Sequence, residues 1–415
     1  MRVVIVNTSE RTGGAAIAAR RLMEALKGSG IKVKMVVRDK ETDEVTVVQL
    51  RKSWLGIWNF LWERLMILKS NLFRKKNLFA VDIANAGTDI TGLPEFVQAD
   101  VIHLHWINQG MLSLGNIKKI LQSGKPVVWT MHDQWPFTGI CHYSGECDRY
   151  ASHCQDCHLL YHRHRFDLSY RVFEKKLSLY KHSKITFVAC SRWLEGLAKS
   201  SVLAQGHQVT NIPNPINTSL YHPIDKVSVR KKLGLPTDKK LLMFGSMKIT
   251  DKRKGIDYLI EACRILSDSP SLAILIMGKD ADACKSLFPF PVYSMSYRTD
   301  EKDIVDVYNA ADLYVTPSLS DNLPNTIMEA MACGVPCVGF NIGGIPEMID
   351  HLHNGYVATY KSAEDLANGI IWSLNETNYP SLSEGARRKV TGNYSEQAIA
   401  KRYINIYNAV IGEND

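Results

Sequence analysis

The sequence alternates short apolar segments with helix-like segments, and this alternation limits the possible folds more than any other feature. Short, continuous apolar runs are typical of strands buried on both faces of a parallel sheet, with helices as the crossovers. The alternation occurs as two series of predicted strands: 3–6, 32–38, 100–106, 126–132 and 184–191, then 240–246, 272–278, 312–318 and 336–340. The stretch 209–223 holds three prolines and three asparagines, and this composition is typical of a linker.

The two series predict an α/β chain of two Rossmann-like, doubly wound parallel-sheet domains. A length of 415 residues fits two domains at roughly 150 residues or more each. We expect an N-terminal domain over 1–208, a C-terminal domain over 209–393 and a final helix within 394–415. In such sheets ligands bind at the carboxyl ends of the strands, so a cleft between the domains is the expected site.

The N-terminus reaches charged and glycine residues after a few apolar ones, which is unlike a secretory signal. No apolar run approaches the roughly 18–20 residues that a membrane span needs. We therefore expect a cytoplasmic protein. The formal net charge of +8 suggests an anionic partner without identifying it.

Most of the positive surplus lies in the segment 51–79, which holds seven basic residues and one acidic residue. Trp54, Trp58 and Trp62 are four residues apart in it and share one helical face. A basic helix with an aromatic face is typical of a helix on an anionic membrane surface. The alternative is a helix packed on its own domain with a solvated basic side, and the sequence leaves both open.

Nine cysteines without an export signal indicate reduced thiols. Four of them are close in sequence: Cys141, Cys147, Cys154 and Cys157. Four thiolates, two of them in a C-x2-C spacing, suit a structural zinc ion. A loop held by packing alone is the alternative, and both interpretations stay open.

Candidate ligand-binding residues of the first domain follow its predicted strands. Gly13 and Gly14 lie between a strand and a helix, where glycine lets the backbone approach an anion. His103, His105 and His132 lie near strand ends, where a histidine can bind a sugar hydroxyl or move a proton. At least one of these three is expected to be structural.

The second domain has a basic turn with Lys248, Arg253 and Lys254, which suits a pyrophosphate. After its third strand, a loop leads into a helix that begins near Asn325, whose first amides suit a phosphate. Asp321 and Glu329 flank this helix start, and carboxylates accept hydrogen bonds from vicinal hydroxyls. Together these residues favour a polyhydroxyl ligand that carries phosphate.

The run SDNLPNTIMEAMACGVPCV, followed by NIGGIPE, resembles the signature of the retaining glycosyltransferases of family four, which have the GT-B fold. The RKGIDYLIEA stretch, the IPNPIN linker and the N-terminal GGA turn follow in the family's order and spacing. The resemblance covers nearly the whole chain. It implies transfer of a sugar from a nucleotide-diphosphate sugar to an acceptor hydroxyl with retention of configuration.

The resemblance also implies roles for single residues. Glu329 matches the glutamate on the ribose, Lys254 the lysine on the pyrophosphate and His132 the histidine near the donor sugar. Asp321 stands where a glutamate is usual, and Ser246 stands after Gly245 where an arginine is usual. The remaining implied donor contacts are Gly13, Gly14, Asn322, Leu323, Pro324, Asn325 and Thr326, with Lys248 or Arg253 in place of the arginine and Tyr297 near the base.

No metal cofactor is implied for the chemistry. The first domain is expected to bind the acceptor, and the 51–79 segment favours a sugar or lipid-linked oligosaccharide of a surface polysaccharide pathway (capsule, O-antigen or exopolysaccharide). The protein is then expected to lie peripherally on the inner face of the cell membrane. A GT-B sugar-nucleotide epimerase or hydrolase is the alternative; a non-catalytic basic binding protein, including a nucleic-acid binder, fits the local charge poorly.

Overall fold

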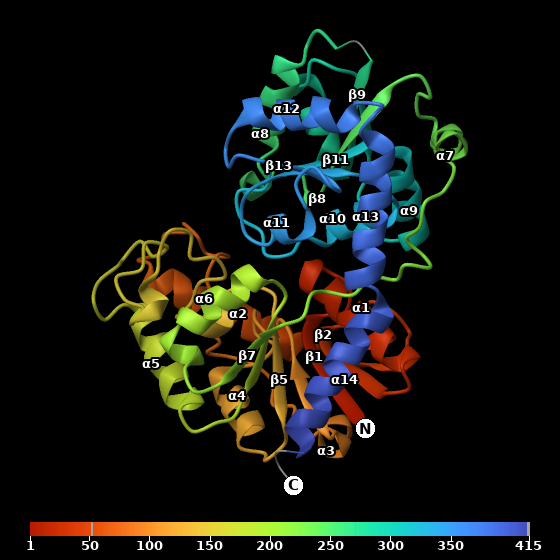
Figure 1. Cartoon of the computed structure of the whole chain (residues 1–415). Coiled ribbons are helices and arrows are strands. Elements are labelled where there is room, and N and C mark those ends of the chain that lie inside the picture. The colour runs from red at the N-terminus through yellow and green to blue at the C-terminus, as the bar shows by residue number, and fades with distance from the viewer. Residues whose placement is uncertain (51–52, 270, 413–415) are drawn as a thin grey trace. The chain divides into compact units, whose positions relative to one another are not determined.

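The computed structural model describes residues 1–50, 53–269 and 271–412 (Figure 1). Its contacts divide the chain into two compact units, Met1–Pro213 with the residues from Ile399 on, and Asn214–Ala398. The expected boundary after residue 208 falls inside a strand of the first unit, Gln208–Asn211. Among the described residues, no helix has the length and apolar character needed to cross a membrane.

The first unit is built on a seven-stranded parallel sheet in the order β3-β2-β1-β4-β5-β6-β7. The strands are β1 (Arg2–Ser9), β2 (Lys32–Asp39), β3 (Val47–Gln49), β4 (Val101–Leu104), β5 (Val127–Met131), β6 (Thr186–Ala189) and β7 (Gln208–Asn211). The helices are α1 (Gly14–Gly28), α2 (Ser53–Ser70), α3 (Pro94–Gln98), α4 (Leu114–Leu121), α5 (Leu168–Tyr180), α6 (Arg192–Ser200) and α14 (Glu396–Gly412). Short 3-10 turns lie at Trp135–Phe137, Arg149–Ala151 and Val202–Ala204.

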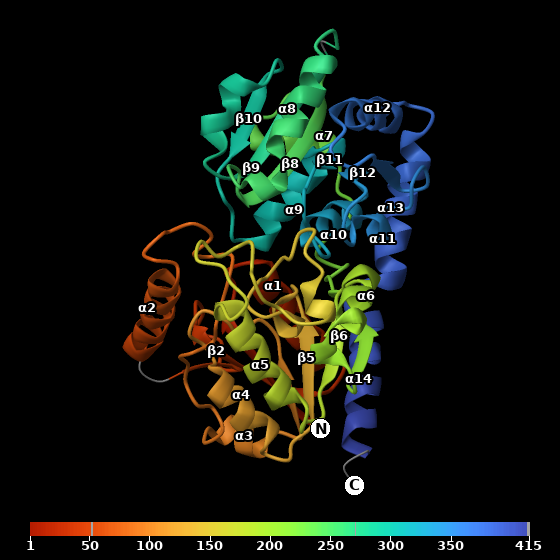
Figure 2. The same ribbon diagram turned by 90° about the vertical axis from the view of Figure 1, so that its left-hand side faces the viewer.

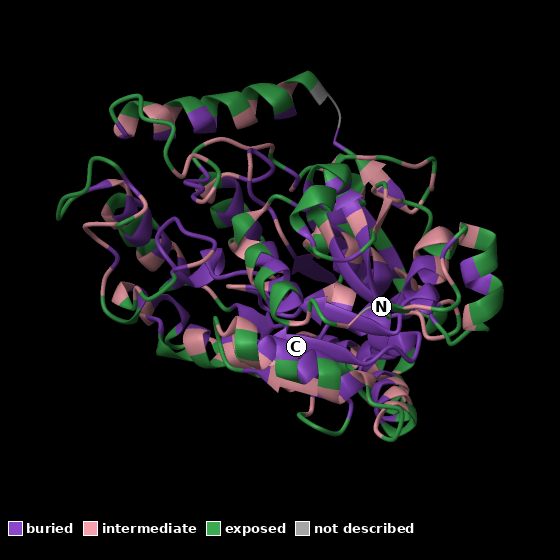
Figure 3. Cartoon of the chain, turned by 90° about the horizontal axis from the view of Figure 1, so that it is seen from above, coloured by how far each residue is buried: buried purple, intermediate pink, exposed green. Residues whose placement is uncertain are grey.

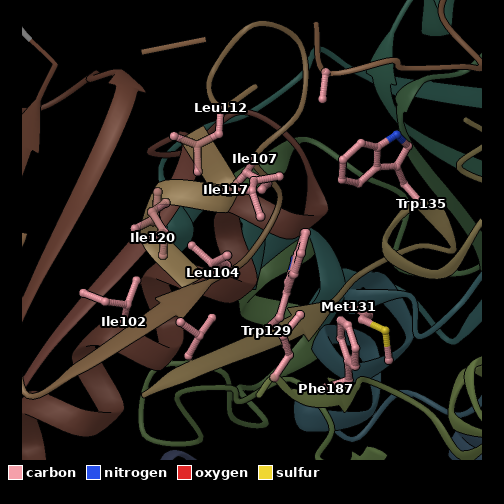
Figure 4. Close-up of a cluster of buried hydrophobic side chains, with 14 of the residues drawn as sticks. Ile102, Leu104, Ile107, Leu112, Ile117, Ile120, Trp129, Met131, Trp135 and Phe187 are labelled. Carbon is pink, nitrogen blue, oxygen red and sulfur yellow. The ribbon is translucent and has the colours of Figure 1, made fainter. Parts of the chain in front are cut away.

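Both faces of this sheet are buried because successive side chains of each strand point to opposite sides. Val4 and Val6 pack with the helices α3 to α6, whereas Val3 and Ile5 pack with α1 and α14. Figure 4 shows part of the first cluster, where Trp129 of β5 lies near Phe187 of β6. This double burial explains why the strands are almost continuously apolar in sequence.

The second unit repeats the plan with a six-stranded parallel sheet, β10-β9-β8-β11-β12-β13 (Figure 2). The strands are β8 (Lys240–Lys248), β9 (Leu272–Lys279), β10 (Val292–Met295), β11 (Leu313–Thr316), β12 (Cys337–Phe340) and β13 (Gly355–Ala358). The helices are α7 (Lys226–Leu233), α8 (Ile256–Ile265), α9 (Glu301–Ala310), α10 (Asn325–Ala332), α11 (Ile345–Met348), α12 (Ala363–Leu374) and α13 (Tyr379–Asn393). The 3-10 turns η4 (Lys252–Lys254) and η5 (Ala281–Leu287) follow β8 and β9. The predicted α/β class with two parallel sheets is confirmed.

The last helix, α14, is joined to the first sheet by buried polar contacts as well as by apolar packing. The hydroxyl of Tyr407 lies 2.7 Å from Nδ1 of His103, and the hydroxyl of Tyr403 lies 2.8 Å from Oγ1 of Thr130. Thr130 Oγ1 is in turn 2.7 Å from His103 Nε2. His103 is fully buried and both of its ring nitrogens contact hydroxyls, which fits the structural role expected of at least one of the three histidines.

We predict that Tyr407→Phe destabilises the protein by about 1–3 kcal/mol, because it leaves Nδ1 of the buried His103 without its hydroxyl partner. The measurement is the free energy of unfolding in urea. Tyr161→Phe, at an exposed tyrosine of the same unit, is the control and is expected to change it by less than about 0.5 kcal/mol. Equal stabilities of the two variants would contradict the assignment of this contact.

Acidification is expected to destabilise the first unit. Burial lowers the pKa of His103 to about 3, whereas an unfolded histidine titrates near 6.5. The unfolded state therefore binds the extra proton below about pH 6.5, and stability falls as the pH drops, with a slope of up to about 1.4 kcal/mol per pH unit for this group. Urea midpoints measured between pH 7.5 and 5 test this, and a flat profile in that window would refute it.

Candidate functional site: a buried aspartate at the start of helix α10

The loop between β11 and α10 is fixed against the basic turn η4 by two close backbone contacts. The amide of Leu319 donates to the carbonyl of Arg253 at 2.8 Å. Gly255 has φ +69°, and a Cβ atom there would lie 1.9 Å from the carbonyl oxygen of Pro317. Only glycine allows this approach, so Gly255 lets the loop lie beside the two preceding basic residues, Arg253 and Lys254.

The carboxylate of Asp321 is the centre of this site. It is 8% exposed, and its Oδ2 accepts from Lys254 Nζ at 2.5 Å and from Ser318 Oγ at 3.2 Å. Arg253 Nη1 lies 3.9 Å from Oδ1. Burial would raise the pKa of Asp321, but Lys254, Arg253 and the hydrogen bonds outweigh it and hold the pKa below its usual range.

Gly343 holds the other side of the loop. Its φ is +60°, and a Cβ atom would lie 1.8 Å from the carbonyl oxygen of Asp321. The NIGGIPE run therefore has a direct steric reason for a glycine at this position. Gly255 and Gly343 together fix the backbone on either side of the charged cluster.

Helix α10 begins immediately after this loop. Pro324 is its N-cap residue and provides no side-chain cap for the first amides. Asn325 accepts a hydrogen bond from Asn214 Nδ2 at 3.0 Å through its Oδ1, which orients the first residue of the helix. Asn322 and Leu323 are buried, and Thr326 is half-buried. The N-terminus of a helix favours an anion.

Glu329 lies one turn further along α10 and is 7% exposed. Its Oε2 accepts a hydrogen bond from the hydroxyl of Tyr308 at 2.8 Å. Burial, and then the negative charge of Glu329, raises the pKa of Tyr308, so this phenol stays neutral and donates. The contact fixes the orientation of the Glu329 carboxylate.

Of the predicted basic residues, Arg253 and Lys254 gather at Asp321, whereas Lys248 does not. Arg253 also donates to the carbonyl of Ser320 at 2.8 Å. Lys248 is exposed at the end of β8, where it is paired in register with Lys279 of β9. Tyr297 lies beside the same Lys279, whose Nζ is 5.5 Å from the ring centre.

The candidate residues of the first unit lie at the ends of β1 and β5. Gly13, the N-cap residue of α1, has φ +97°, and a Cβ atom there would meet nothing within 4 Å; Gly14 follows as the first residue of α1. His132 follows β5; its Nε2 is 2.9 Å from His105 Nδ1, and its Nδ1 is 3.5 Å from Cys190 Sγ. Burial lowers the pKa of His132 to about 4, so its imidazole is neutral near pH 7.

A buried polar network next to His132 was not predicted from the sequence. Asp133 accepts from Trp106 Nε1 at 2.8 Å and lies 2.7 Å from Nδ1 of His142. The other ring nitrogen of His142 is 2.5 Å from Asp82, which also pairs with Arg64 of α2. The His-Asp pair at 132–133 was a visible signal, but nothing in the sequence indicated that residues 64, 82 and 142 would meet it.

The predicted zinc site is not supported. Cys141, Cys147, Cys154 and Cys157 line one cavity of about 20 Å³. Across the described ranges, however, no three His, Cys, Asp or Glu side chains are placed to hold a metal ion. Burial raises the pKa of Cys154 to about 12 and that of Cys157 to about 11, and Cys154 Sγ accepts from the amide of Gly139 at 3.2 Å. The alternative interpretation, a loop held by packing, fits this placement of the side chains.

Two protein-family models match the chain. Residues 12–220 match the model described as Glycosyltransferase Family 4, and residues 238–376 match the model described as Glycosyl transferases group 1. The first match alone covers half of the chain, and the second contains Lys254, Asp321 and Glu329.

Curated relatives agree with these models. An N-acetyl-alpha-D-glucosaminyl L-malate synthase of Bacillus anthracis is 25% identical over 211 residues, which are 50% of this chain and 55% of the relative. An N,N'-diacetylbacillosaminyl-diphospho-undecaprenol alpha-1,3-N-acetylgalactosaminyltransferase of Campylobacter jejuni is 29% identical over 201 residues, 47% of this chain and 53% of the relative. The chain therefore spans about half the length of these relatives.

Solved structures share the fold. A sucrose-phosphate synthase of Thermosynechococcus elongatus has a TM-score of 0.68 at 19% identity and covers 99% of both chains. The HepE protein of Anabaena, solved with UDP-glucose, has a TM-score of 0.63 at 18% identity and covers 99% of this chain and 100% of its own. Together with the two parallel-sheet units and the family models, these likenesses identify the chain as a member of glycosyltransferase family 4, with the GT-B fold.

Proposed function

We propose that the chain transfers a sugar from a nucleotide-diphosphate sugar to an acceptor hydroxyl, with retention of the anomeric configuration. The observation that supports this best is the meeting of Lys254, Asp321 and the start of α10. A cation and the amides at a helix N-terminus suit a diphosphate, whereas a fixed carboxylate beside them suits sugar hydroxyls. We assign donor binding to the Asn214–Ala398 unit on this basis.

In the proposed site the ammonium of Lys254 uses one donor on Asp321 and keeps two for phosphate oxygens. The amides of Asn325 and Thr326 would hold the same diphosphate, and Glu329, oriented by Tyr308, would accept from the ribose hydroxyls. Arg253 takes the place of the arginine that is usual after Gly245, because it reaches Asp321 and Lys248 does not. The other donor contacts are proposed as predicted, Gly13, Gly14, Asn322, Leu323, Pro324 and Tyr297.

Retention is proposed to proceed by front-face attack of the acceptor hydroxyl on the anomeric carbon. The bond from that carbon to the diphosphate breaks as the new glycosidic bond forms, and the hydroxyl proton passes to a diphosphate oxygen. Lys254 and the α10 amides stabilise the charge that builds on the diphosphate. The neutral imidazole of His132 is proposed to hydrogen-bond the donor sugar.

The acceptor is proposed to bind the unit formed by Met1–Pro213 and the residues from Ile399 on, and to be a sugar or lipid-linked oligosaccharide of surface polysaccharide synthesis. The Campylobacter relative is named for a diphospho-undecaprenol substrate. Two further relatives are named for teichuronic acid and colanic acid biosynthesis, in Bacillus subtilis and Escherichia coli. The protein is then proposed to work peripherally on the inner face of the cell membrane.

The first test is a thermal-shift panel of UDP-, GDP-, ADP- and CMP-linked sugars. We expect one nucleotide class to raise the Tm, because a ligand that binds the native state alone stabilises it. Glu329→Gln is expected to reduce that shift, with a Kd raised about tenfold or more, because an amide replaces the carboxylate on the ribose. Glu376→Gln, at an exposed position of the same unit, is the control. An unchanged Kd in Glu329→Gln would refute the assigned role.

Lys254→Ala is expected to lower kcat/KM about 10- to 100-fold, because it removes a charge-assisted contact to the leaving diphosphate. Lys254→Arg should recover part of the loss, and Lys252→Ala, at an exposed lysine of the same turn, should be near wild type. Product formation from donor and acceptor, with NMR of the anomeric proton, measures turnover and configuration together. Inversion at the anomeric carbon, or donor consumption without a glycosylated product, would overturn the proposed reaction.

A further inference from the structure

Helix α2 presents an apolar face that no other part of the described chain covers. Six residues form this face, which we call the α2 face: Trp54, Ile57, Trp58, Leu61, Trp62 and Leu65. Each of them is between 47% and 64% exposed. Their spacing places them along one side of the helix. In Figure 3 the ribbon of α2 is coloured mostly as exposed. A patch of this kind on a folded domain is typical of an interaction surface.

The opposite side of α2 is firmly attached to its own domain. Glu63 Oε1 accepts from the amides of Ile83 and Ala84 at 2.8 and 2.7 Å, and the buried Arg64 donates to the carbonyl of Val81 at 3.0 Å. Ile67 is fully buried among apolar neighbours. The α2 face is therefore held outward by a fixed helix and is not the side of a loose arm.

The segment that follows α2 extends the surface with exposed apolar and cationic side chains. Leu72 and Phe73 are 58% and 67% exposed and have φ values of +51° and +60°. This backbone region is unfavourable for bulky residues, and such conformations are retained mainly where function needs them. The exposed cations of this surface are Lys69, Arg74, Lys75 and Lys76.

We propose that the α2 face and these cations dock the protein on an anionic lipid bilayer. Tryptophans lie favourably at the boundary between headgroups and acyl chains, and cations nearby bind anionic headgroups. A second copy of the chain on the same face would bring the two sets of cations together, which opposes that arrangement. Docking itself is argued from the exposed side chains and their charge. Only its purpose, access to a lipid-linked acceptor, rests on the proposed function.

A chain of buried polar contacts connects α2 to the end of β5, in the unit that is proposed to bind the acceptor. Arg64 on the attached side of α2 pairs with Asp82, which contacts His142, which contacts Asp133. Asp133 directly follows His132 at the end of β5. The bilayer-facing helix is thus held in a fixed orientation relative to this strand end by a continuous chain of buried polar contacts.

The test is flotation of the full chain with vesicles of phosphatidylcholine alone and of phosphatidylcholine with about 30% phosphatidylglycerol, whose negative surface potential attracts Lys and Arg side chains. We expect the protein to bind the anionic vesicles and not those of phosphatidylcholine alone, and we expect added salt to weaken this binding. The triple variant W54S/W58S/W62S and the triple variant K69E/K75E/K76E should each weaken the apparent partition about tenfold or more. Because all six positions are exposed, folding should survive, and the urea midpoint checks this.

The matched control is K175E/K181E/K401E, which makes the same charge change at exposed lysines elsewhere on the first unit and should keep most of the binding. If the control variant loses as much vesicle binding as K69E/K75E/K76E, the loss is explained by net charge alone, and the proposed surface is overturned. The proposal would also be overturned if the wild-type protein floats with neither kind of vesicle. A wild-type dimer in solution that becomes monomeric in W54S/W58S/W62S would overturn it as well. Donor-induced Tm shifts without vesicles should be unchanged in all variants, so failure of docking and failure of the proposed transferase activity are separable.

Discussion

The proposed donor site depends on the close approach of one loop to two glycines. Loop 317–324 can carry Asp321 into contact with Lys254 because Gly255 and Gly343 leave no Cβ atom in its way. The ion pair then satisfies a carboxylate that is buried and would otherwise be costly. Backbone sterics therefore come first, and the charge cluster and the orientation of α10 follow from them.

A second constraint operates in the other unit, where several buried polar side chains contact one another in chains. His103 connects Thr130 to Tyr407, and so joins β5 to the last helix of the chain. Beside it, Asp133 and His142 continue toward Asp82. Each member satisfies its neighbour, which is the condition under which a buried polar network stabilises a structure. Such networks also fix the ends of strands, which the role proposed for His132 requires.

The fold could be read from the sequence because its signal is local and repeated. Strands such as β1 and β5 are short apolar runs, and the break at 209–223 separates the two series. The placement of Asp321 and Glu329 at α10 followed from the loop-to-helix pattern. The cysteine cluster misled because spacing along the chain says nothing of thiol geometry. The four cysteines line one cavity, yet among the described residues no three of them are placed to hold a metal ion.

Two features of the structure could not be predicted from the sequence, because they depend on contacts between residues far apart in the chain: which basic residue reaches Asp321, and which side of α2 faces inward. Arg253 and Lys248 are equivalent basic residues in sequence, and only the turn at Gly255 decides that Arg253 reaches Asp321. In the same way, the sequence of α2 is apolar on nearly all sides, which is compatible with burial or with exposure. Glu63 and Arg64 settle the question, since their buried partners at 81–84 fix which side faces inward. Two charged residues in an apolar helix thus determine which face, with its three tryptophans, remains available to a partner.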